Sequence, residues 1–390
     1  MHLSHNHVNF MEWLREVPLT FEWMLLYAFG LVTLIQLFYY WFFFSRLAFG
    51  KPKKKYDATP PVSVIICAKN EYLNLQENLP GFLDQDYPDY EVLVVNDGSD
   101  DESELLLHEM RGKNPRLTVV NLQKNVNFFS GKKFPLSIGI KEARHGLILV
   151  ADADCRPASR YWISGMVSCF DPATEIVLGY GPYRKKPGLL NKLIRYDAFF
   201  IGLQYLSFAL AGNAYMGVGR NMAYRREVFF RVKGFTSHYK VMSGDDDLFI
   251  NQAATRRNVR IEVDPDSHTL SLPKETVGKW FHQKRRHMTT GKYYKPRLKF
   301  LLGLLSLSQV LFYLLFAILM ACCVLSTIGL IAAAIFAIRM ISMLIIFYKA
   351  GKKLNQSRLS LYSPLFDLIM LVLNLTFAFS AMFFNNHRWK

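Results

Sequence analysis

The sequence has few of the features that mark the common nucleotide-binding proteins. No Gly-x-Gly-x-x-Gly segment opens a predicted helix, and Gly131-Lys132 lacks both the upstream glycine and the following Ser or Thr of a P-loop. The 5 cysteines among 390 residues contain no Cys-x-x-Cys pair, and we read all five as structural. A bound phosphate would therefore have to be held by a metal ion and by basic side chains.

Charged side chains are absent from long stretches of the chain. None occurs in residues 23–44, and Arg339 and Asp367 are the only ones in residues 300–348 and 361–384. A membrane-spanning helix needs about 20 apolar residues, and the middle stretch is long enough for two. The sequence therefore predicts four transmembrane helices, one N-terminal and three C-terminal. The first is too long for a signal peptide and has no small-residue cleavage site.

Two details of these apolar stretches need an interpretation. Arg339 and Asp367 are charges within spans, which suggests function, but we favour structural roles. Arg339 is then expected to snorkel to the cytosolic face and Asp367 to lie near the start of the last span, or the two pair across helices. Residues 198–219 are also free of charge, but a span there would put the acidic motifs on opposite sides of the membrane. We expect an amphipathic surface lying on the bilayer instead.

The net charge of +16 arises from 47 basic and 31 acidic residues, and the basic ones are grouped. Clusters follow the first span (residues 46–55) and separate the third from the fourth (residues 349–358). The positive-inside rule places both loops, and the large segment between spans one and two, in the cytosol. Topology thus explains much of the charge, and no nucleic-acid partner is expected. We read His2, His5 and His7 as a frayed tail rather than as metal ligands.

Short apolar runs alternate with helical segments in the large middle region. The pattern predicts strands at 62–67, 90–95, 117–122 and 147–150, and helices at 75–82, 102–110 and 134–144. Such alternation is typical of βαβ units with a parallel sheet covered on both faces. Ligands bind at the carboxyl ends of such strands. Three of these ends carry polar clusters: Lys69-Asn70-Glu71, Asp97-Gly98-Ser99 and Asp152-Ala153-Asp154.

The last of these clusters ends the fourth strand on two aspartates one residue apart. Mg²⁺ and Mn²⁺ accept few protein carboxylates and complete their shells with water and substrate phosphates. Asp152 and Asp154 are therefore predicted to hold a divalent cation for a diphosphate. The alternative is a solvated turn, because most isolated Asp-x-Asp pairs lie in such turns.

Two further motifs carry charges suited to chemistry. Gly244-Asp245-Asp246-Asp247-Leu248 opens a predicted helix that runs through Ala254, either as a capping cluster or with one carboxylate as a general base. The segment "WFHQKRRH", residues 280–287, reads as a helix next to the membrane. It either binds anionic lipid or, because Gln283 and Arg286 share a face, contacts a fixed anionic group.

Seven segments in order resemble the family 2 glycosyltransferases, in particular the membrane-bound branch with cellulose, chitin and hyaluronan synthases and ceramide glucosyltransferase. They are "PVSVIICAKNE", "VLVVNDGSDD", "GKKFPLSIGI", "VADADCRP", "GVGRNMAYRREVF", "GDDDLFI" and "QKRRH", and cover roughly residues 60–290. The resemblance implies an α/β GT-A fold with a DXD motif and inversion at the anomeric carbon. It also implies a nucleotide-diphospho-sugar donor and Mg²⁺ or Mn²⁺.

The resemblance also implies roles for particular residues. Those matching nucleotide-sugar and diphosphate contacts are Glu71, Asp97, Lys132, Asp152, Gln283 and Arg286. Within the DXD pair, Asp154 matches the member that binds the metal, together with Asp152. Asp245 matches the catalytic base, and Asp246 takes its place if the register shifts by one.

The sequence departs from the family pattern at two positions, and the first bears on the acceptor. His287 replaces the tryptophan that helps polymer synthases bind the growing sugar chain, and Gly244 replaces a frequent glutamate. We therefore expect transfer of one sugar to a lipid, glycolipid or lipid-linked acceptor. The alternatives are processive synthesis of a polysaccharide exported through the spans, and a non-catalytic scaffold that responds to sugar-nucleotides.

The predicted domain organisation follows from these motifs and apolar stretches. The sequence is expected to divide into an N-terminal tail with the first span (residues 1–45), a basic cytosolic linker (46–60), a cytosolic GT-A domain with interfacial helices (61–297) and three C-terminal spans (298–390). The protein is accordingly expected in a membrane, with its catalytic domain in the cytosol.

Overall fold

The computed structural model describes residues 20–51, 55–123, 131–241 and 243–382, so the three N-terminal histidines lie outside the described residues. The strands are β1 (Val62–Ala68), β2 (Tyr90–Asn96), β3 (Leu117–Asn121), β4 (Leu147–Asp152), β5 (Cys155–Pro157), β6 (Ile176–Leu178), β7 (Met222–Arg225), β8 (Val259–Ile261) and β9 (Thr269–Ser271). The helices are α2 (Phe21–Phe38), α3 (Ser45–Phe49), α4 (Tyr72–Leu83), α5 (Ser103–Lys113), α6 (Lys133–Glu142), α7 (Trp162–Val167), α8 (Leu189–Leu210), α9 (Arg226–Arg231), α10 (Asp247–Ala253), α11 (Val277–Met288), α12 (Pro296–Cys323), α13 (Thr327–Lys353), α14 (Ser357–Ser360) and α15 (Ser363–Met382). Single turns of 3₁₀ or π geometry are η1 (Tyr39–Phe44), η2 (Thr236–His238), η3 (Pro265–Ser267) and η4 (Gly291–Tyr293).

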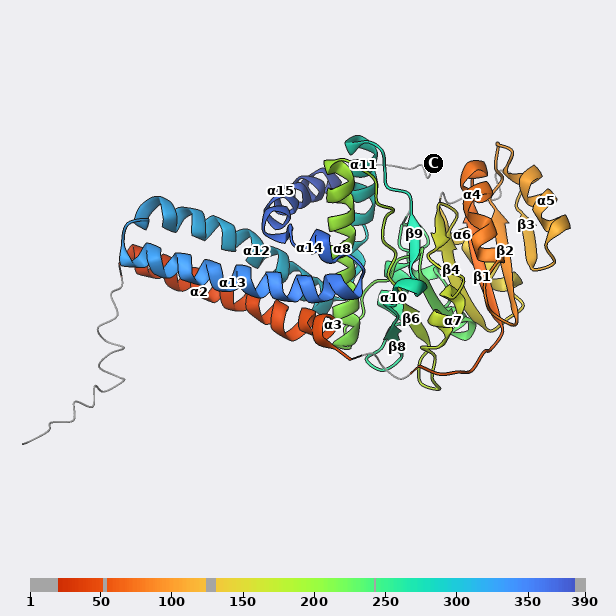
Figure 1. Cartoon of the computed structure of the whole chain (residues 1–390), viewed down its shortest axis with the longest axis horizontal. Coiled ribbons are helices and arrows are strands. Elements are labelled where there is room, and N and C mark those ends of the chain that lie inside the picture. The colour runs from red at the N-terminus through yellow and green to blue at the C-terminus, as the bar shows by residue number, and fades with distance from the viewer. Residues whose placement is uncertain (1–19, 52–54, 124–130, 242, 383–390) are drawn as a thin grey trace, which may run out of the picture. The chain divides into compact units, whose positions relative to one another are not determined.

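A seven-stranded sheet in the order β3-β2-β1-β4-β7-β6-β8 forms the centre of the α/β region (Figure 1). Strands β3, β2, β1 and β4 run parallel, which confirms the four strands that the sequence predicted. β7 is antiparallel to both of its neighbours, and β6 pairs in parallel with β8. The sheet is therefore mostly parallel, and its antiparallel strand lies beside β4, the strand that ends on Asp152.

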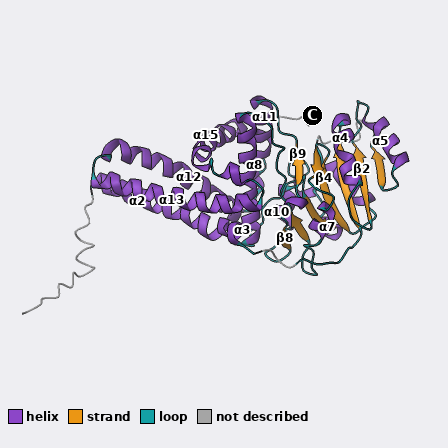
Figure 2. Ribbon diagram, in the orientation of Figure 1, coloured by secondary structure: helices purple, strands orange, loops and turns teal. Residues whose placement is uncertain are grey.

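Helices cover the sheet on its two faces, as expected for a parallel sheet (Figure 2). β1 and β2 are buried along their whole length, because side chains alternate between the faces and both faces are packed. On one face, apolar residues of β1 pack with those of α4, α5 and α7 in one core. Helix α6 packs on the opposite face against β1 and β2.

The chain divides into two compact units, residues 40–301 with 343–390, and residues 1–39 with 302–342. In the second of these units, an apolar core joins α2 to the portions of α12 and α13 that belong to it. Arg339 is fully buried there, donates to Gln36 Oε1 (3.1 Å) and Tyr313 OH (3.4 Å), and lies 4.8 Å from the ring centre of Phe312. The expectation that Arg339 snorkels to a membrane surface is therefore wrong, because polar and aromatic neighbours accommodate its charge inside the helix cluster.

Among the described residues, four helical segments are long and apolar enough to cross a membrane: Phe21–Phe49, Pro296–Cys323, Thr327–Lys353 and Ser363–Met382. One is N-terminal and three are C-terminal, as the charge-free stretches predicted. The charge-free residues 198–219 form the second half of α8 and the loop after it. Most of this half of α8 is buried within the protein, so its apolar composition serves packing, and the expected amphipathic surface is not found there.

Candidate active site

The ends of β1 and β2 place the first pair of predicted residues side by side. The strands pair in register up to Ala68 and Asn96, so the residues that follow emerge at one edge of the sheet. Asp97 is 4% exposed, with its carboxylate 3.7 Å from Lys69 Nζ. Glu71 accepts a hydrogen bond from Asn74 Nδ2 (2.5 Å) and lines a hollow of about 450 Å³ with residues 70–74 and 101–102. Glu71 and Asp97 thus lie at neighbouring strand ends, each held by a local polar partner.

The Asp-x-Asp motif lies at the end of β4, where Asp152 is the last strand residue and Asp154 follows in the turn. Oxygens of both carboxylates and Cys155 Sγ lie within 4.8 Å of one another. The thiol contacts Ser271 Oγ at 2.9 Å, and burial raises the pKa of Cys155 well above its usual value, so it stays protonated. The donors available to a hard cation are therefore the two carboxylates, the ligand type that Mg²⁺ and Mn²⁺ prefer.

The two carboxylates differ in their electrostatic environment. Burial acts to raise the pKa of Asp152, but the ammonium of Lys132, which donates to Asp152 Oδ1, lowers it overall with help from Arg220 and Arg286. The pKa of Asp154 is raised by burial and by the charge of Asp152. A divalent cation between them would offset this repulsion, so the donor set fits such an ion. Within the described part of the chain, Asp154 is the carboxylate without a hydrogen-bonded ammonium.

The three consecutive aspartates at the start of α10 make different contacts. Asp246 is the N-cap: its Oδ1 accepts from the amide of Asp247 (2.7 Å) and its Oδ2 from the amide of Gly219 (2.9 Å). Asp247 is buried and accepts from Thr290 Oγ1 and from Tyr294 OH. These two carboxylates therefore hold the backbone together, and the helix begins at Asp247 rather than including all three aspartates as predicted.

Asp245 is the member of the trio that faces the Asp-x-Asp motif. Its Oδ2 lies 4.0 Å from Lys132 Nζ, the same ammonium that binds Asp152. The Cα of Gly219 lies next to this carboxylate, and a Cβ there would make ordinary contact with the oxygen at 3.4 Å. Burial and the charge of Asp246 raise the pKa of Asp245 to about 6. A carboxylate with this pKa is ionised at neutral pH yet basic enough to accept a proton.

Helix α11 brings Gln283 and Arg286 to the same region. Gln283 Nε2 donates to Tyr183 OH (3.4 Å), and the positive charge of Arg286 acts on Asp152. Arg286 Nε is buried and has no hydrogen-bond partner within the described ranges. This N–H is therefore available to donate to an anionic ligand. The helix also packs along α15, one of the four candidate spans, with Trp280 5.4 Å from Phe377 between ring centres.

Arg220 is a residue of this site that the sequence analysis did not single out. Its Nε donates to Gly181 O (2.9 Å), and its guanidinium stacks over Tyr183, 4.8 Å from the ring centre. Its charge also lowers the pKa of Asp152. Arg220 follows the Gly217-Val218-Gly219 stretch of a segment that the resemblance included, but nothing in that pattern says which way the side chain points.

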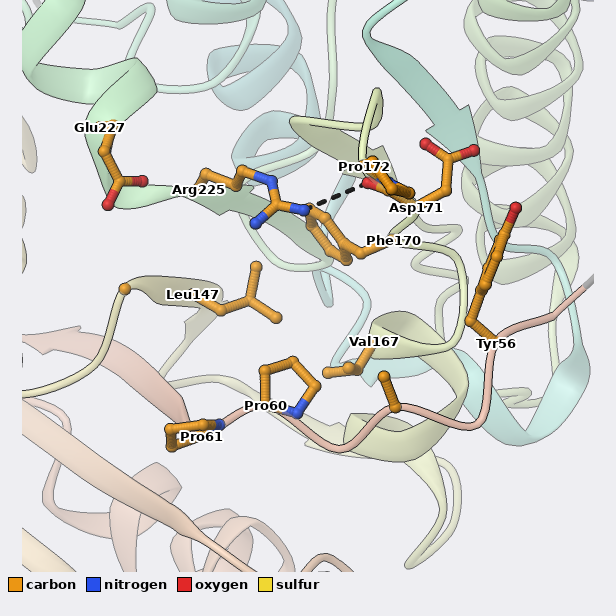
Figure 3. A pocket seen from close by; sticks show the side chains of 12 residues that line it. Tyr56, Pro60, Pro61, Leu147, Val167, Phe170, Asp171, Pro172, Arg225 and Glu227 are labelled. Atoms are coloured by element: carbon orange, nitrogen blue, oxygen red, sulfur yellow. Dashed lines mark hydrogen bonds between the residues drawn. The ribbon is translucent and has the colours of Figure 1, made fainter.

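A larger cavity, of about 610 Å³, lies elsewhere (Figure 3). It is lined mainly by apolar side chains, among them Pro60, Pro61, Leu147 and Phe170. Pro61 and Leu147 stand at the beginnings of β1 and β4, whereas the acidic motifs follow the ends of these strands. The cavity is therefore at the opposite edge of the sheet and contains none of the predicted site residues.

Comparison with known proteins identifies a matching family and similar structures. Residues 63–232 match the sequence model of Glycosyl transferase family 2. Poly-beta-1,6-N-acetyl-D-glucosamine synthases of Staphylococcus epidermidis and of Staphylococcus aureus (strain COL) are 26% identical over 255 residues, which are 63% of this chain. The chain spans 59% of the length of these curated relatives.

Among solved structures, a mannosyltransferase of Pyrobaculum calidifontis in complex with GDP-Man and Mn²⁺ is similar with a TM-score of 0.54 and 20% identity. The match covers 88% of this chain and 99% of that one. The sheet and this likeness define an α/β domain of the GT-A type. The family match supports the predicted resemblance for residues 63–232 and ends before the last two of the seven segments, GDDDLFI and QKRRH.

Proposed function

We propose that this protein is an inverting, metal-dependent glycosyltransferase that moves a sugar from a nucleotide-diphospho-sugar to a lipid or lipid-linked acceptor at the cytosolic membrane face. The observation that carries the proposal is the position of Asp245. A carboxylate with a pKa of about 6 lies 4.0 Å from Lys132, whose ammonium also binds the Asp-x-Asp motif. A proton acceptor thus stands next to a site suited to a leaving diphosphate.

The reaction would proceed by direct displacement. The acceptor oxygen attacks the anomeric carbon from the side opposite the diphosphate, and Asp245 takes the hydroxyl proton. The bond from the anomeric carbon to the diphosphate oxygen breaks, and its electron pair leaves with the nucleoside diphosphate. Lys132 and Arg286 stabilise the charge that builds on that oxygen. A Mg²⁺ or Mn²⁺ ion bound by Asp154 and Asp152 would add positive charge at the same place.

The nucleotide is expected at the ends of β1 and β2, where Glu71 and Asp97 would contact ribose and base. This assignment rests on the sequence resemblance, and the adjacency of the two strand ends supports it. Lys69, bound to Asp97, provides a positive charge at the same edge.

The packing of α11 along a candidate span supports a lipid-linked acceptor. Helix α11 carries Gln283 and Arg286 and packs along the candidate span α15. An acceptor anchored in a bilayer could therefore present its head group near α11. His287, in place of the tryptophan typical of polymer synthases, favours transfer of a single sugar.

Processive polysaccharide synthesis is the second candidate. The two staphylococcal relatives are named as synthases of a polymer of N-acetylglucosamine, which favours it. A non-catalytic scaffold is disfavoured, because Lys132, Asp152 and Asp245 form a connected acidic and basic site.

The product distinguishes these functions. Membranes containing the full chain are given radiolabelled sugar-nucleotides and a lipid extract, and the label is separated by solvent extraction and by size. Label of one small size in the organic phase supports single transfer to lipid. A series of growing size that is soluble in water supports the polymer synthase. If no donor labels any product in either phase, both functions are rejected.

A further inference from the structure

Two consecutive lysines at the start of α6 reach different targets. Lys132 points to the carboxylates of the site, where it binds Asp152. Lys133 is 4% exposed, and its ammonium donates to three backbone carbonyl oxygens, those of His238 (2.7 Å), Val241 (2.6 Å) and Ser243 (2.7 Å). An ammonium has three hydrogens, so this arrangement uses all of them.

The three carbonyls belong to the segment directly before the proposed base. Gly244 follows Ser243 with φ of +103°, a conformation that other residues rarely adopt, and Asp245 comes next. On the other side, Asp246 and Asp247 fix the start of α10 through Gly219, Thr290 and Tyr294. The backbone of Asp245 is thus held from one side by Lys133 and from the other by its two acidic neighbours.

We propose that Lys133 is a positioning residue that holds the segment before Gly244 so that Asp245 faces the donor. The inference rests on the proposed function, because it assigns Lys133 a role in placing the base. An apolar side chain of similar length could fill the same space, but it would leave three converging carbonyl oxygens without this donor. The requirement is therefore for hydrogen-bond donors and not for volume alone.

The charges around Lys133 give the role a pH dependence. The facing groups are Asp245, Asp246, Asp247 and the imidazole of His238. Burial lowers the pKa of Lys133 to about 8, although the three carboxylates oppose this change. Burial, followed by the charge of Lys133, lowers the pKa of His238 to about 4, so this imidazole stays neutral. Above about pH 8, a neutral amine has two hydrogens for three carbonyls, and the hold on the segment weakens.

The test compares Lys133→Met and Lys133→Arg in the full chain with Lys141→Met, an exposed position at the end of the same helix. We expect Lys133→Met to lower kcat about 10²-fold, the loss typical of a small displacement of a catalytic group, with the donor KM within about twofold. Lys133→Arg should recover part of kcat and move the loss of activity above pH 8 to higher pH. Lys141→Met should match the parent protein.

A second readout does not depend on catalysis. Amide hydrogen exchange of residues 236–247 should be faster in Lys133→Met than in Lys141→Met without any donor. Unchanged kcat, or unchanged exchange in this segment, would overturn the inference. If the parent protein transfers no sugar, the proposed function fails; faster exchange would then still support the hold on the segment, and unchanged exchange would reject it.

Discussion

The replacement Asp245→Asn removes the proton acceptor and keeps the size and shape of the side chain. Because general base catalysis typically contributes 10²- to 10⁴-fold, we expect kcat at pH 7.5 to fall by about this factor. Donor affinity should stay within about twofold, since Lys132, Arg286 and the Asp-x-Asp motif remain. The residual rate would reflect the electrostatic contribution of those groups.

The pKa of Asp245 determines how the loss of kcat in Asp245→Asn depends on pH. With a pKa of about 6, the carboxylate is almost fully ionised at pH 7.5. At pH 5 only about one-tenth of it is ionised, so the parent rate should fall about tenfold between the two values. The rate of the Asp245→Asn protein should not fall in this way at low pH. The ratio of the parent rate to the variant rate should therefore be about tenfold smaller at pH 5 than at pH 7.5.

The assay is single-turnover release of nucleoside diphosphate, with donor binding measured separately by calorimetry. Asp266→Asn makes the same chemical change at an exposed position and should leave both quantities unchanged. An Asp245→Asn protein with full activity would refute the assignment of the base. If Asp246→Asn lost transfer while Asp245→Asn kept it, the base would be the N-cap carboxylate, and the geometric argument for Asp245 would be wrong.

Two further substitutions test the surroundings of the base. Arg286→Gln removes the guanidinium whose Nε is buried without a partner in the described ranges, and should lower kcat by about 10²-fold, checked against the exposed Lys279→Gln. An unchanged kcat would show that Arg286 does not face the leaving group. Asp247→Asn weakens the buried contacts to Thr290 and Tyr294, and should lower the free energy of unfolding by about 1–3 kcal/mol. Thermal unfolding compared with Asp266→Asn measures this, and an equal Tm would contradict it.

Much of the fold followed from the sequence because its signals are local. The β-branched runs marked β1 to β4, and the charge-free stretches marked the four candidate spans. The three-residue strands β6 and β8 and the antiparallel β7 could not be predicted in the same way. Their pairing depends on partners far along the chain, and short segments carry too little periodicity to reveal it.

The sequence predicted the motifs of the site but not the role of each residue within them. Three adjacent aspartates look alike in sequence, and only the contacts of Asp246 and Asp247 separate them from Asp245. The roles of Arg220 and Lys133 depend on contacts with distant segments, as with Lys133 and Val241, which are 108 positions apart in the sequence. Arg339 was misjudged for the same reason, since Gln36 and Tyr313 come from other helices.

The most direct test of the proposed function is nucleoside diphosphate release by the purified full chain in lipid, across a panel of sugar-nucleotides. Mn²⁺, Mg²⁺ and EDTA are compared in the presence of membrane lipid extract, with Asp154→Asn and Asp266→Asn as matched variants. We predict release from one donor that requires a divalent cation, is lost in Asp154→Asn and is retained in Asp266→Asn. Release that EDTA and Asp154→Asn leave unchanged, or no release from any donor, would contradict a metal-dependent glycosyltransferase.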